Sequence, residues 1–337
     1  MKVAVVILNW NGEQMLRQFL PSVVKHSILP ETLGEAVVYV ADNGSTDGSL
    51  ALLDAEFPMV RTIIFEENYG FADGYNRAFE QIDAEYAVLL NSDVEVTEGW
   101  LVPLVEYMDE HLQVGACQPK LMAYHRKNEF EYAGAMGGFL DRYGYPYCRG
   151  RIFDTLEKDH GQYDADVPLL WATGACLMVR LATYKEVGGL DGRFFAHMEE
   201  IDLQWRMQLA GWRIMVEPRA KVYHLGGGTL PPSPTKIYLN HRNNLAMLYK
   251  CSSPLQRLVV AVVRPFTDAA EALGYILKLQ PRKAWAIVRA WGSFIAWHKM
   301  LASKRKAVVR TKKVENIYSF SIVLRYLFGA RRFKNMM

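Results

Sequence analysis

Four short apolar segments in the first third of the chain each end in a cluster of polar side chains. The segments lie near residues 3–9, 35–41, 60–65 and 86–90, and stretches with helical spacing separate them. Such alternation predicts an α/β fold with a mostly parallel central sheet, right-handed crossovers and flanking helices. In these sheets ligands bind beyond the carboxyl ends of the strands. We therefore expect one binding site at the edge where the four polar clusters meet.

The middle of the chain is harder to interpret. From about residue 115 the pattern becomes irregular, and residues 132–151 are rich in Gly and Tyr, which indicates loops or short strands bordering a pocket. Regular elements return as an apolar strand pair around Gly174 and a helix over residues 181–187 that ends at a Gly pair. A long helix with acids near its start is then expected over residues 194–211, followed by a strand-like segment over residues 213–229, whose last three residues lie outside those that the structure describes.

Charge divides the 337 residues into two parts. Residues 1–249 carry 21 Lys and Arg against 33 Asp and Glu, a net charge of −12, whereas residues 250–337 carry 18 against 3, a net charge of +15. We expect one domain over residues 1–245 and a basic, amphipathic helical region over residues 246–337. No apolar run approaches the length of a membrane span, and the run from Val3 to Leu8 is too short for a signal peptide. The four cysteines lack zinc or redox spacing, which favours a reduced, cytoplasmic chain.

Two carboxylates follow the strand at residues 86–90. Asp93 and Glu95 come directly after Asn91 and Ser92, and the chain has neither a P-loop nor a G-x-G-x-x-G fingerprint to hold phosphates. Carboxylates at a strand end can instead hold a divalent cation that clamps a diphosphate. The same spacing is common in solvated surface turns, so the pair alone leaves both interpretations open.

Seven motifs in a fixed order connect these clusters to a known family. They are VILNWNG, VADNGSTDGS, ENYGFADGYNRAF, LLNSDVEV, WATGACLMVR, FFAHMEEIDLQWR and VYHLGGGT. Together they resemble the family 2 glycosyltransferases, which are inverting, nucleotide-sugar-dependent enzymes with a GT-A fold. The resemblance covers about residues 1–245 and is nearest to the bacterial rhamnosyltransferase-like branch that builds surface polysaccharides.

The resemblance implies that one group of residues binds the nucleotide-diphosphate sugar. This donor set is Asn9, Asp42, Asn68, Gly70, Asn76, Asn91, Ser92, Asp93, Trp171 and Gly174. Other roles fit some of them equally well. Asp42 could cap a helix, although Asp47 is better placed for that, and Gly70 could be a turn glycine. Trp171 could pack on a sugar ring or be buried for structural reasons.

The resemblance also implies a metal site. Asp93, Glu95 and His224 match its expected ligands, and oxygen and imidazole donors suit Mn²⁺ or Mg²⁺. The family pattern is Asp-x-Asp, whereas this chain has Asp-x-Glu, so direct contact between Glu95 and the metal is in question.

The acids at the start of the expected long helix include the candidate catalytic base. Aligned on the family's Glu-Asp pair, Glu200 takes the position of the residue that deprotonates the acceptor hydroxyl, with Glu199 and Asp202 as alternatives. Consecutive helical residues point about 100° apart, so Glu199 and Glu200 cannot both reach one proton. The structural alternative is that acids at this position simply interact favourably with the helix dipole.

These interpretations together predict an inverting glycosyltransferase. It would move a sugar from dTDP-rhamnose or a UDP-hexose to a hydroxyl of a glycan or lipid-linked acceptor in cell-surface polysaccharide synthesis. The alternatives are a sugar-1-phosphate nucleotidyltransferase and a non-catalytic nucleotide-sugar or glycan-binding module. The tail over residues 254–337 predicts peripheral contact with the inner face of the cell membrane. A second subunit, in a homodimer, is the other partner considered, and we expect no nucleic-acid partner because no matching motif is present.

Overall fold

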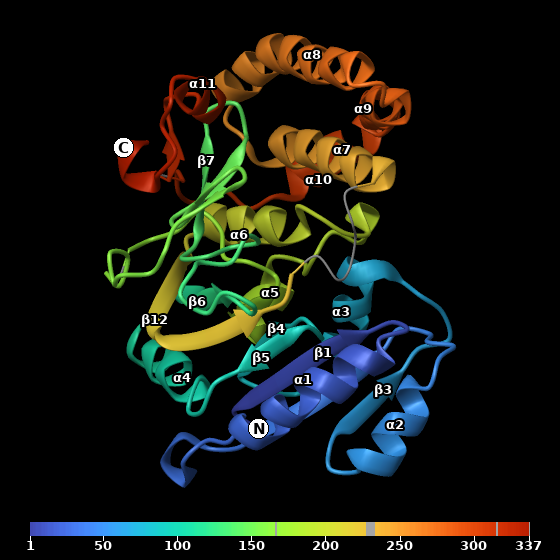
Figure 1. Ribbon diagram of the computed structural model, residues 1–337, viewed down its shortest axis with the longest axis vertical. Coiled ribbons are helices and arrows are strands. Elements are labelled where there is room, and N and C mark those ends of the chain that lie inside the picture. Colours follow the sequence, from blue (N-terminus) through green and yellow to red (C-terminus); the bar gives the residue numbers. More distant parts are fainter. Residues whose placement is uncertain (166, 227–232, 315, 337) are drawn as a thin grey trace.

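The computed structural model describes residues 1–165, 167–226, 233–314 and 316–336 (Figure 1). Its first half has the predicted alternation of strands and helices. In chain order these elements are β1 (Val3–Asn9), α1 (Glu13–His26), β2 (Ala36–Asp42), α2 (Ser49–Glu56), β3 (Arg61–Ile64), α3 (Gly70–Glu80) and β4 (Tyr86–Leu90). β3, β2, β1 and β4 lie side by side and are parallel, so their carboxyl ends meet at one edge.

The remaining strands extend this sheet to eight strands in the order β3-β2-β1-β4-β11-β6-β12-β5. The elements that supply and separate them are β5 (Val94–Val96), α4 (Leu101–Glu110), β6 (Val114–Ala123), β11 (Cys176–Arg180), α5 (Leu181–Glu186), α6 (Glu199–Ala210) and β12 (Arg213–His224). β11 is antiparallel to both β4 and β6, whereas β6 and β12 are parallel. The central sheet is therefore mixed, with its parallel half at the amino-terminal side.

Three expectations for the middle of the chain were wrong. β6 is a regular strand within the sheet where we expected irregular chain, and only Ala123 of its ten residues is not buried. Because both of its faces are covered, it shows no polar alternation, and Pro119 interrupts its strand-like composition. The expected strand pair around Gly174 contains one strand, β11, and the long helix α6 begins only at Glu199.

The sheet separates two apolar cores. Along β1, the side chains of Val3, Val5 and Ile7 pack with α1, α2 and α4, while those of Ala4 and Val6 pack with α3 and α6. This is the period of two expected for a strand that is buried on both faces. All four cysteines are free and buried.

A second, smaller sheet combines four strands from the middle of the chain with one strand near its carboxyl end. Its order is β10-β9-β8-β7-β13, with β7 (Gly138–Asp141), β8 (Pro146–Cys148), β9 (Arg151–Ile152), β10 (Thr155–Leu156) and β13 (Ile317–Tyr318). β13 lies parallel to β7, although about 175 residues separate them. This pairing joins the basic tail to the body of the protein.

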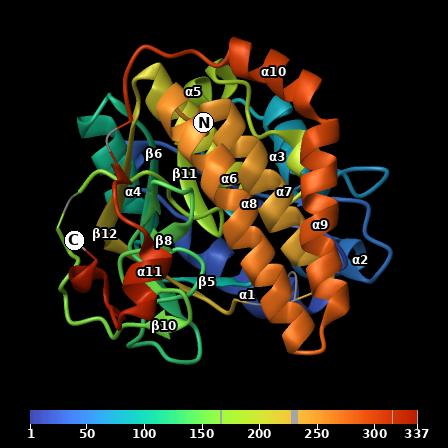
Figure 2. The same cartoon turned by 90° about the horizontal axis from the view of Figure 1, so that it is seen from above.

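Helices cover the end of the molecule opposite the amino-terminal half of the sheet (Figures 1 and 2). They are α7 (Pro234–Cys251), α8 (Pro254–Leu277), α9 (Pro281–Ala296), α10 (His298–Ala307) and α11 (Ile322–Leu327). α7 crosses the boundary that we placed after residue 245, so the division into two domains stays a prediction. Within the described ranges, no helix has the length and apolar character needed to cross a membrane.

Candidate functional site

The parallel register places Asn9 directly beside Asp42 at the carboxyl edge. Asn9 Nδ2 donates to Asp42 Oδ2 at 3.0 Å, and the Ser45 backbone N–H donates to Asp42 Oδ1 at 2.9 Å. Asp42 therefore holds the loop after β2 and caps no helix. Asp47 does accept from the first backbone N–H groups of two helices, Glu13 in α1 and Ser49 in α2, as its sequence position suggested.

The side-chain oxygen of Asn9 lies beside Asp42 and is free to accept a hydrogen bond in the described structure. Asn9 Oδ1 is buried and has no hydrogen-bond partner among the described residues. A Cβ on Gly12 would lie 2.3 Å from it, so the space beside this oxygen exists only because residue 12 is glycine. A buried acceptor of this kind is costly unless a donor satisfies it.

The third polar cluster supports the start of α3. Asn68 Oδ1 accepts from Asn43 Nδ2 at 3.0 Å and from the Gly70 backbone N–H at 2.8 Å. Gly70 has φ of +75°, and a Cβ there would lie 2.5 Å from the Phe195 ring. Glycine is thus required both by the backbone and by the close approach of Phe195.

Asn76 lies farther along α3 and does not face the same edge. Its side chain donates to the Leu190 carbonyl at 2.9 Å and accepts from the Leu190 N–H at 3.0 Å and from the Tyr184 hydroxyl at 2.6 Å. These contacts fix the segment that leads to α6. A direct donor contact by Asn76 stays a prediction from the resemblance.

Asp93 and His224 meet where β5 and β12 pair. His224 Nε2 lies 3.1 Å from Asp93 Oδ1, and His224 Nδ1 lies 3.2 Å from Glu131 Oε1. All three side chains are buried. Burial alone would lower the pKa of His224, but the contacts with Asp93 and Glu131 outweigh it and raise the pKa to about 10.

This group is not a complete metal site by geometry. Among residues in the described ranges, no three His, Cys, Asp or Glu side chains are placed as a ready set of ligands. Asp93 Oδ2 is nevertheless buried without a hydrogen-bond partner in the described part of the chain. Such an oxygen suits a hard cation, and the neighbouring imidazole and carboxylates suit Mn²⁺ or Mg²⁺.

Glu95 does not join this group. Its carboxylate lies 2.7 Å from Lys127 Nζ, which in turn lies over the Tyr223 ring. Glu95 pairs with Tyr223 in the strand register, one position before His224, and successive strand residues point to opposite faces. The structure thus separates the two acids of the D-x-E motif that we expected to act together.

The backbone before α6 is unusual. Phe195, His197 and Met198 all have positive φ, between 67° and 70°, although none is glycine. Non-glycine residues rarely adopt this conformation, and they do so mainly at functional sites. The turn delivers Glu199 and Glu200 to the first two positions of α6.

The two glutamates have different environments. Glu199 is buried, and its burial, followed by repulsion from Glu200, raises its pKa well above the ordinary value. Glu200 keeps some exposed surface, and desolvation raises its pKa to about 7. The Oε2 atom of each has no hydrogen-bond partner within the described structure. Both acids can therefore hold a proton near neutral pH, but Glu200 is the more accessible.

Asp202 belongs to a different network. It is fully buried, and its oxygens lie 2.9 Å from Arg206 Nε and 2.8 Å from Lys250 Nζ. Lys250 also lies 2.5 Å from Asp191, and a third cation, Lys304, pairs with Asp191 as well. The three cations and Asp191 line a cavity of about 250 Å³, to which neither candidate glutamate of α6 contributes. Asp202 is thus committed to structural ion pairs, and the structure does not group it with the two glutamates.

Trp171 and Gly174 occupy different positions relative to the site. Trp171 is 3 % exposed, its ring packs on Gly138, and its Nε1 donates to the Phe139 carbonyl at 3.1 Å. These contacts are structural, and packing of Trp171 on a sugar face stays a prediction from the resemblance. Gly174 lies between Phe71 and Glu200, since a Cβ there would be 3.3 Å and 3.7 Å from them.

The fourth polar cluster is connected to the same loop. The Asn91 backbone N–H donates to the Ala175 carbonyl at 2.9 Å, next to Gly174. Asn91 and Ser92 are both half-buried, and they lead directly to Asp93. The Asp93 end of β4 and the Glu200 end of α6 therefore border one region through residues 174 and 175.

Two residues at this site were missed in the sequence. Glu131, the partner of His224, lies in the irregular stretch where no periodicity marks it. Asn243 of α7 is buried, and its Nδ2 donates to the carbonyls of Phe194, Ala196 and His197 at 2.8–3.0 Å. The polar run His241-Arg242-Asn243-Asn244 inside an otherwise apolar helix was the available signal.

Comparison with known proteins agrees with this architecture. Residues 4–163 match the model of glycosyl transferase family 2. The chain is 28% identical over 238 residues to the N-acetylglucosaminyl-diphospho-decaprenol L-rhamnosyltransferase of Mycobacterium tuberculosis, which covers 65% of this chain and 75% of that protein.

Solved structures share the fold at low identity. GalNAc-T7 with UDP, GalNAc and Mn²⁺ superposes with a TM-score of 0.61 at 16% identity, over 85% of this chain and 54% of that one. Staphylococcus aureus TarS 1-349 superposes with a TM-score of 0.56 at 19% identity, over 92% and 88%. The chain thus has the GT-A fold that these glycosyltransferases share. The match to the family 2 model and the similarity to a rhamnosyltransferase agree with the resemblance that its motifs carry.

Proposed function

We propose that the protein is an inverting, metal-dependent glycosyltransferase. It takes a sugar from a nucleotide-diphosphate donor, dTDP-rhamnose or a UDP-hexose, and transfers it to a hydroxyl of a glycan or lipid-linked acceptor in cell-surface polysaccharide synthesis. One observation carries the proposal. Buried side-chain oxygens that have no hydrogen-bond partner among the described residues occur at both sides of the same region, on Asn9 and Asp93 at the sheet edge and on Glu199 and Glu200 at α6.

The sheet edge supplies the donor side. Asn9 Oδ1 offers an acceptor to a donor group of the base or ribose, and Asp42 holds the loop that shapes this part of the site. Asn68 and Gly70 keep the start of α3 close to Phe195, beneath the proposed nucleotide. Asn91 and Ser92 lead from this region to Asp93, which would hold the cation that binds the diphosphate.

Asp93 and His224 would hold the divalent cation. The unpartnered Asp93 Oδ2 and His224 Nε2 are the candidate ligand atoms, and Glu131 on the other imidazole nitrogen would fix the ring. A bound cation would neutralise the charge that develops on the leaving diphosphate. Glu95 is paired with Lys127, so it would not contact the cation and would affect the metal site only indirectly.

Glu200 would take the proton. The acceptor oxygen attacks the anomeric carbon from the face opposite the diphosphate, the bond to the diphosphate oxygen breaks, and the hydroxyl proton moves to a Glu200 oxygen. Its pKa of about 7 makes Glu200 an effective base at neutral pH while its surface stays accessible. Burial and repulsion from Glu200 raise the pKa of Glu199, so Glu199 would stay protonated when Glu200 ionises.

Donor screening with product analysis tests this function. The purified protein is incubated with dTDP-rhamnose or UDP-hexoses, Mn²⁺ and lipid-linked or free glycan acceptors, and the anomeric configuration of the product is read by NMR. Glycoside formation with inverted configuration is expected. Release of a sugar 1-phosphate, or formation of a nucleotide sugar from one, would instead identify a nucleotidyltransferase. Donor binding without turnover against the full acceptor panel would favour the binding-module alternative.

A further inference from the structure

The outer face of α8 exposes apolar side chains to solvent, whereas the solvent-facing side of a surface helix is usually polar. Its exposed residues form a stripe at intervals of three, four and seven, which is one side of a helix. This outer face consists of Leu255, Leu258, Val262, Phe266, Leu273, Ile276 and Leu277, each between 53% and 76% exposed. The structure describes every residue of α8, and Glu271 is its only exposed charged residue, so the face is almost purely apolar.

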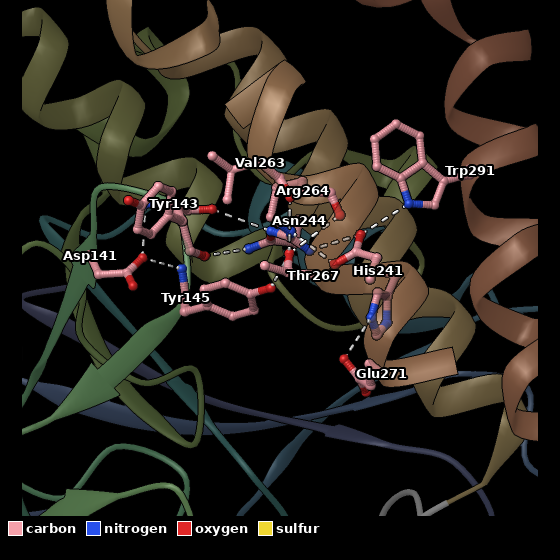
Figure 3. Close-up of polar contacts among 12 residues, drawn as sticks. Asp141, Tyr143, Tyr145, His241, Asn244, Val263, Arg264, Thr267, Glu271 and Trp291 are labelled. Carbon is pink, nitrogen blue, oxygen red and sulfur yellow. Dashed lines mark hydrogen bonds and ion pairs between the residues drawn. The ribbon is translucent and has the colours of Figure 1, made fainter. Parts of the chain in front are cut away.

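The inner face of α8 carries the polar side chains instead (Figure 3). Arg264 and Asp268 are 2% and 1% exposed and pair at 3.0 Å. Arg264 also donates to Asn244 of α7, and Asp268 accepts from Trp291 Nε1 of α9 at 2.9 Å. The polar side is therefore held inward by partners on two neighbouring helices, and the helix cannot rotate its apolar face inward without breaking them.

Exposed apolar residues continue past the end of α8. Leu279, in the turn to α9, is 89% exposed, and Trp285 and Val288 of α9 are 62% and 52% exposed. α8 and α9 form the outermost layer of the helical end of the molecule (Figures 1 and 2). An apolar surface of this extent on a folded protein marks a surface that another body covers.

The charges around this surface identify the covering body. Residues 250–337 hold 18 Lys and Arg against three acids, and Lys278, Arg282 and Lys299 are exposed close to or along the α8–α9 hairpin. Of the three acids, Asp268 is buried and Glu271 pairs with His241. A second copy of the chain would bring the same positive charge against itself, whereas anionic lipid headgroups would be attracted to it.

We propose that the outer face of α8, with Leu279 and the exposed start of α9, inserts into the interface of an anionic lipid bilayer. The apolar side chains enter the boundary between headgroups and acyl chains, and the neighbouring Lys and Arg contact the headgroup phosphates. In this contact the bilayer does not cover the sheet edge, because α6 and α7 lie between that edge and α8. The proposal does not depend on which sugar is transferred.

Vesicle sedimentation tests the proposal with the whole protein. Native protein should pellet with vesicles of mixed phosphatidylglycerol and phosphatidylcholine and stay in the supernatant with phosphatidylcholine alone. Phe266→Glu should weaken binding by about tenfold or more, because a charge replaces a large buried apolar group in the interface. Leu112→Glu is the matched control, since Leu112 is 70% exposed in the amino-terminal half and should leave binding unchanged.

Two further measurements keep the result decisive. Circular dichroism and thermal unfolding should be the same for Phe266→Glu, Leu112→Glu and the native protein, since both substituted residues are exposed. If a Phe266→Glu variant fails this check, Leu258→Glu on the same face replaces it. Native binding by a folded variant, or no binding of native protein to anionic vesicles, would overturn the proposal. A native dimer in light scattering that Phe266→Glu converts to monomer would assign the face to a second copy.

Discussion

Glu199 and Glu200 are chemically identical neighbours that the fold makes unequal. The left-handed turn before α6 places both in the first turn of the helix, but only Glu200 keeps exposed surface, beside Gly174. The pKa of Glu200 rises to about 7 because burial disfavours its charge. A carboxylate tuned to neutral pH and open to a substrate has the properties of a general base.

We expect a pH profile that reflects this pKa. The base must be ionised, so kcat/KM should rise with pH and level off above about pH 7. Glu200→Gln should lower kcat by about 100-fold or more and remove the acidic limb of the profile, while donor affinity stays within about twofold. Glu98→Gln, at an exposed acid, is the control. Unchanged turnover in Glu200→Gln would transfer the role to Glu199.

The same residue should limit stability. Because the folded state raises the pKa of Glu200 above 4.5, its favourable contribution is complete at low pH and is lost as pH rises through about 7. Glu200→Gln should therefore raise Tm relative to the native protein at about pH 8, and the gain should shrink toward pH 4.5. Differential scanning calorimetry across this range measures it. A Tm difference independent of pH would mean that the buried charge of Glu200 is not its cause.

Asp93 and Glu95 provide a second contrast between neighbouring acids. Asp93 is buried beside His224, whereas Glu95 pairs with Lys127 at a half-exposed position. Asp93→Asn should abolish Mn²⁺-dependent binding of a nucleoside diphosphate in isothermal titration calorimetry. Glu95→Gln should weaken it by less than about tenfold, since an exposed ion pair contributes little. Equal losses in the two variants would mean that both carboxylates contact the cation.

At the scale of elements, α7 controls the start of α6. Asn243 is the link, because its single amide donates to three carbonyls of the turn at residues 194–197. A turn with several positive φ values is costly, and these contacts help to hold it in place. The position of the proposed base thus depends on a helix outside the parallel half of the sheet.

Replacing the Asn243 amide should lower kcat with little effect on donor binding. Asn243→Ala removes a buried donor that three carbonyls of the turn share, so the free energy of unfolding should fall by about 1–3 kcal/mol. It should also lower kcat more than it raises KM for the donor, because Glu200 loses its fixed position. Thr235→Ala, at an exposed residue of α7, should change neither. Urea unfolding and steady-state kinetics make the comparison, and an effect on stability alone would refute the positioning role.

Features of the fold and site could be predicted from the sequence where they depend on residues close together in the chain, and not where they depend on distant contacts. The first four strands were predictable because β-branched runs and polar termini recur there, and the register that brings Asn9 to Asp42 follows from parallel pairing. β6 was not predictable, since its polar residues Gln118 and Lys120 are buried and satisfied by distant partners. Glu131 and Asn243 were missed for the same reason: their roles come from contacts with His224 and the turn before α6, which only the fold creates.

At the scale of the molecule, buried charges connect the carboxyl-terminal helices to the part of the chain that carries the proposed site. Lys250 of α7 and Lys304 of α10 both pair with Asp191, and Lys250 also pairs with Asp202 of α6. Burial would raise the pKa of Asp191, but the two lysines outweigh it and hold that pKa far below the ordinary range. The network therefore stabilises the folded state above about pH 4, and this contribution is lost as pH falls further.

Lys250→Met should destabilise the whole protein. Removal of one cation leaves Asp202 with Arg206 alone and Asp191 with the partly exposed Lys304, so we expect a loss of about 3–5 kcal/mol in the free energy of unfolding. Lys299→Met, at an exposed position of α10, should have an effect below about 0.5 kcal/mol. Chemical unfolding followed by fluorescence measures both. A small effect of Lys250→Met would mean that the network contributes little net stability.

The pairing of β13 with β7 has a consequence for how the chain is made. Residues 317 and 318 complete the second sheet, the Ile322 N–H donates to Asp141 and the Phe333 N–H donates to Glu157. During synthesis on the ribosome, the strands β1–β4 emerge early, and β11 is the only neighbour in the sheet that they still lack. β7 can pair with β8 soon after it emerges, but its other partner, β13, follows only after almost the entire chain has been made. Truncating or obstructing the last twenty or so residues should therefore harm maturation of the second sheet, while the parallel half of the large sheet can still assemble.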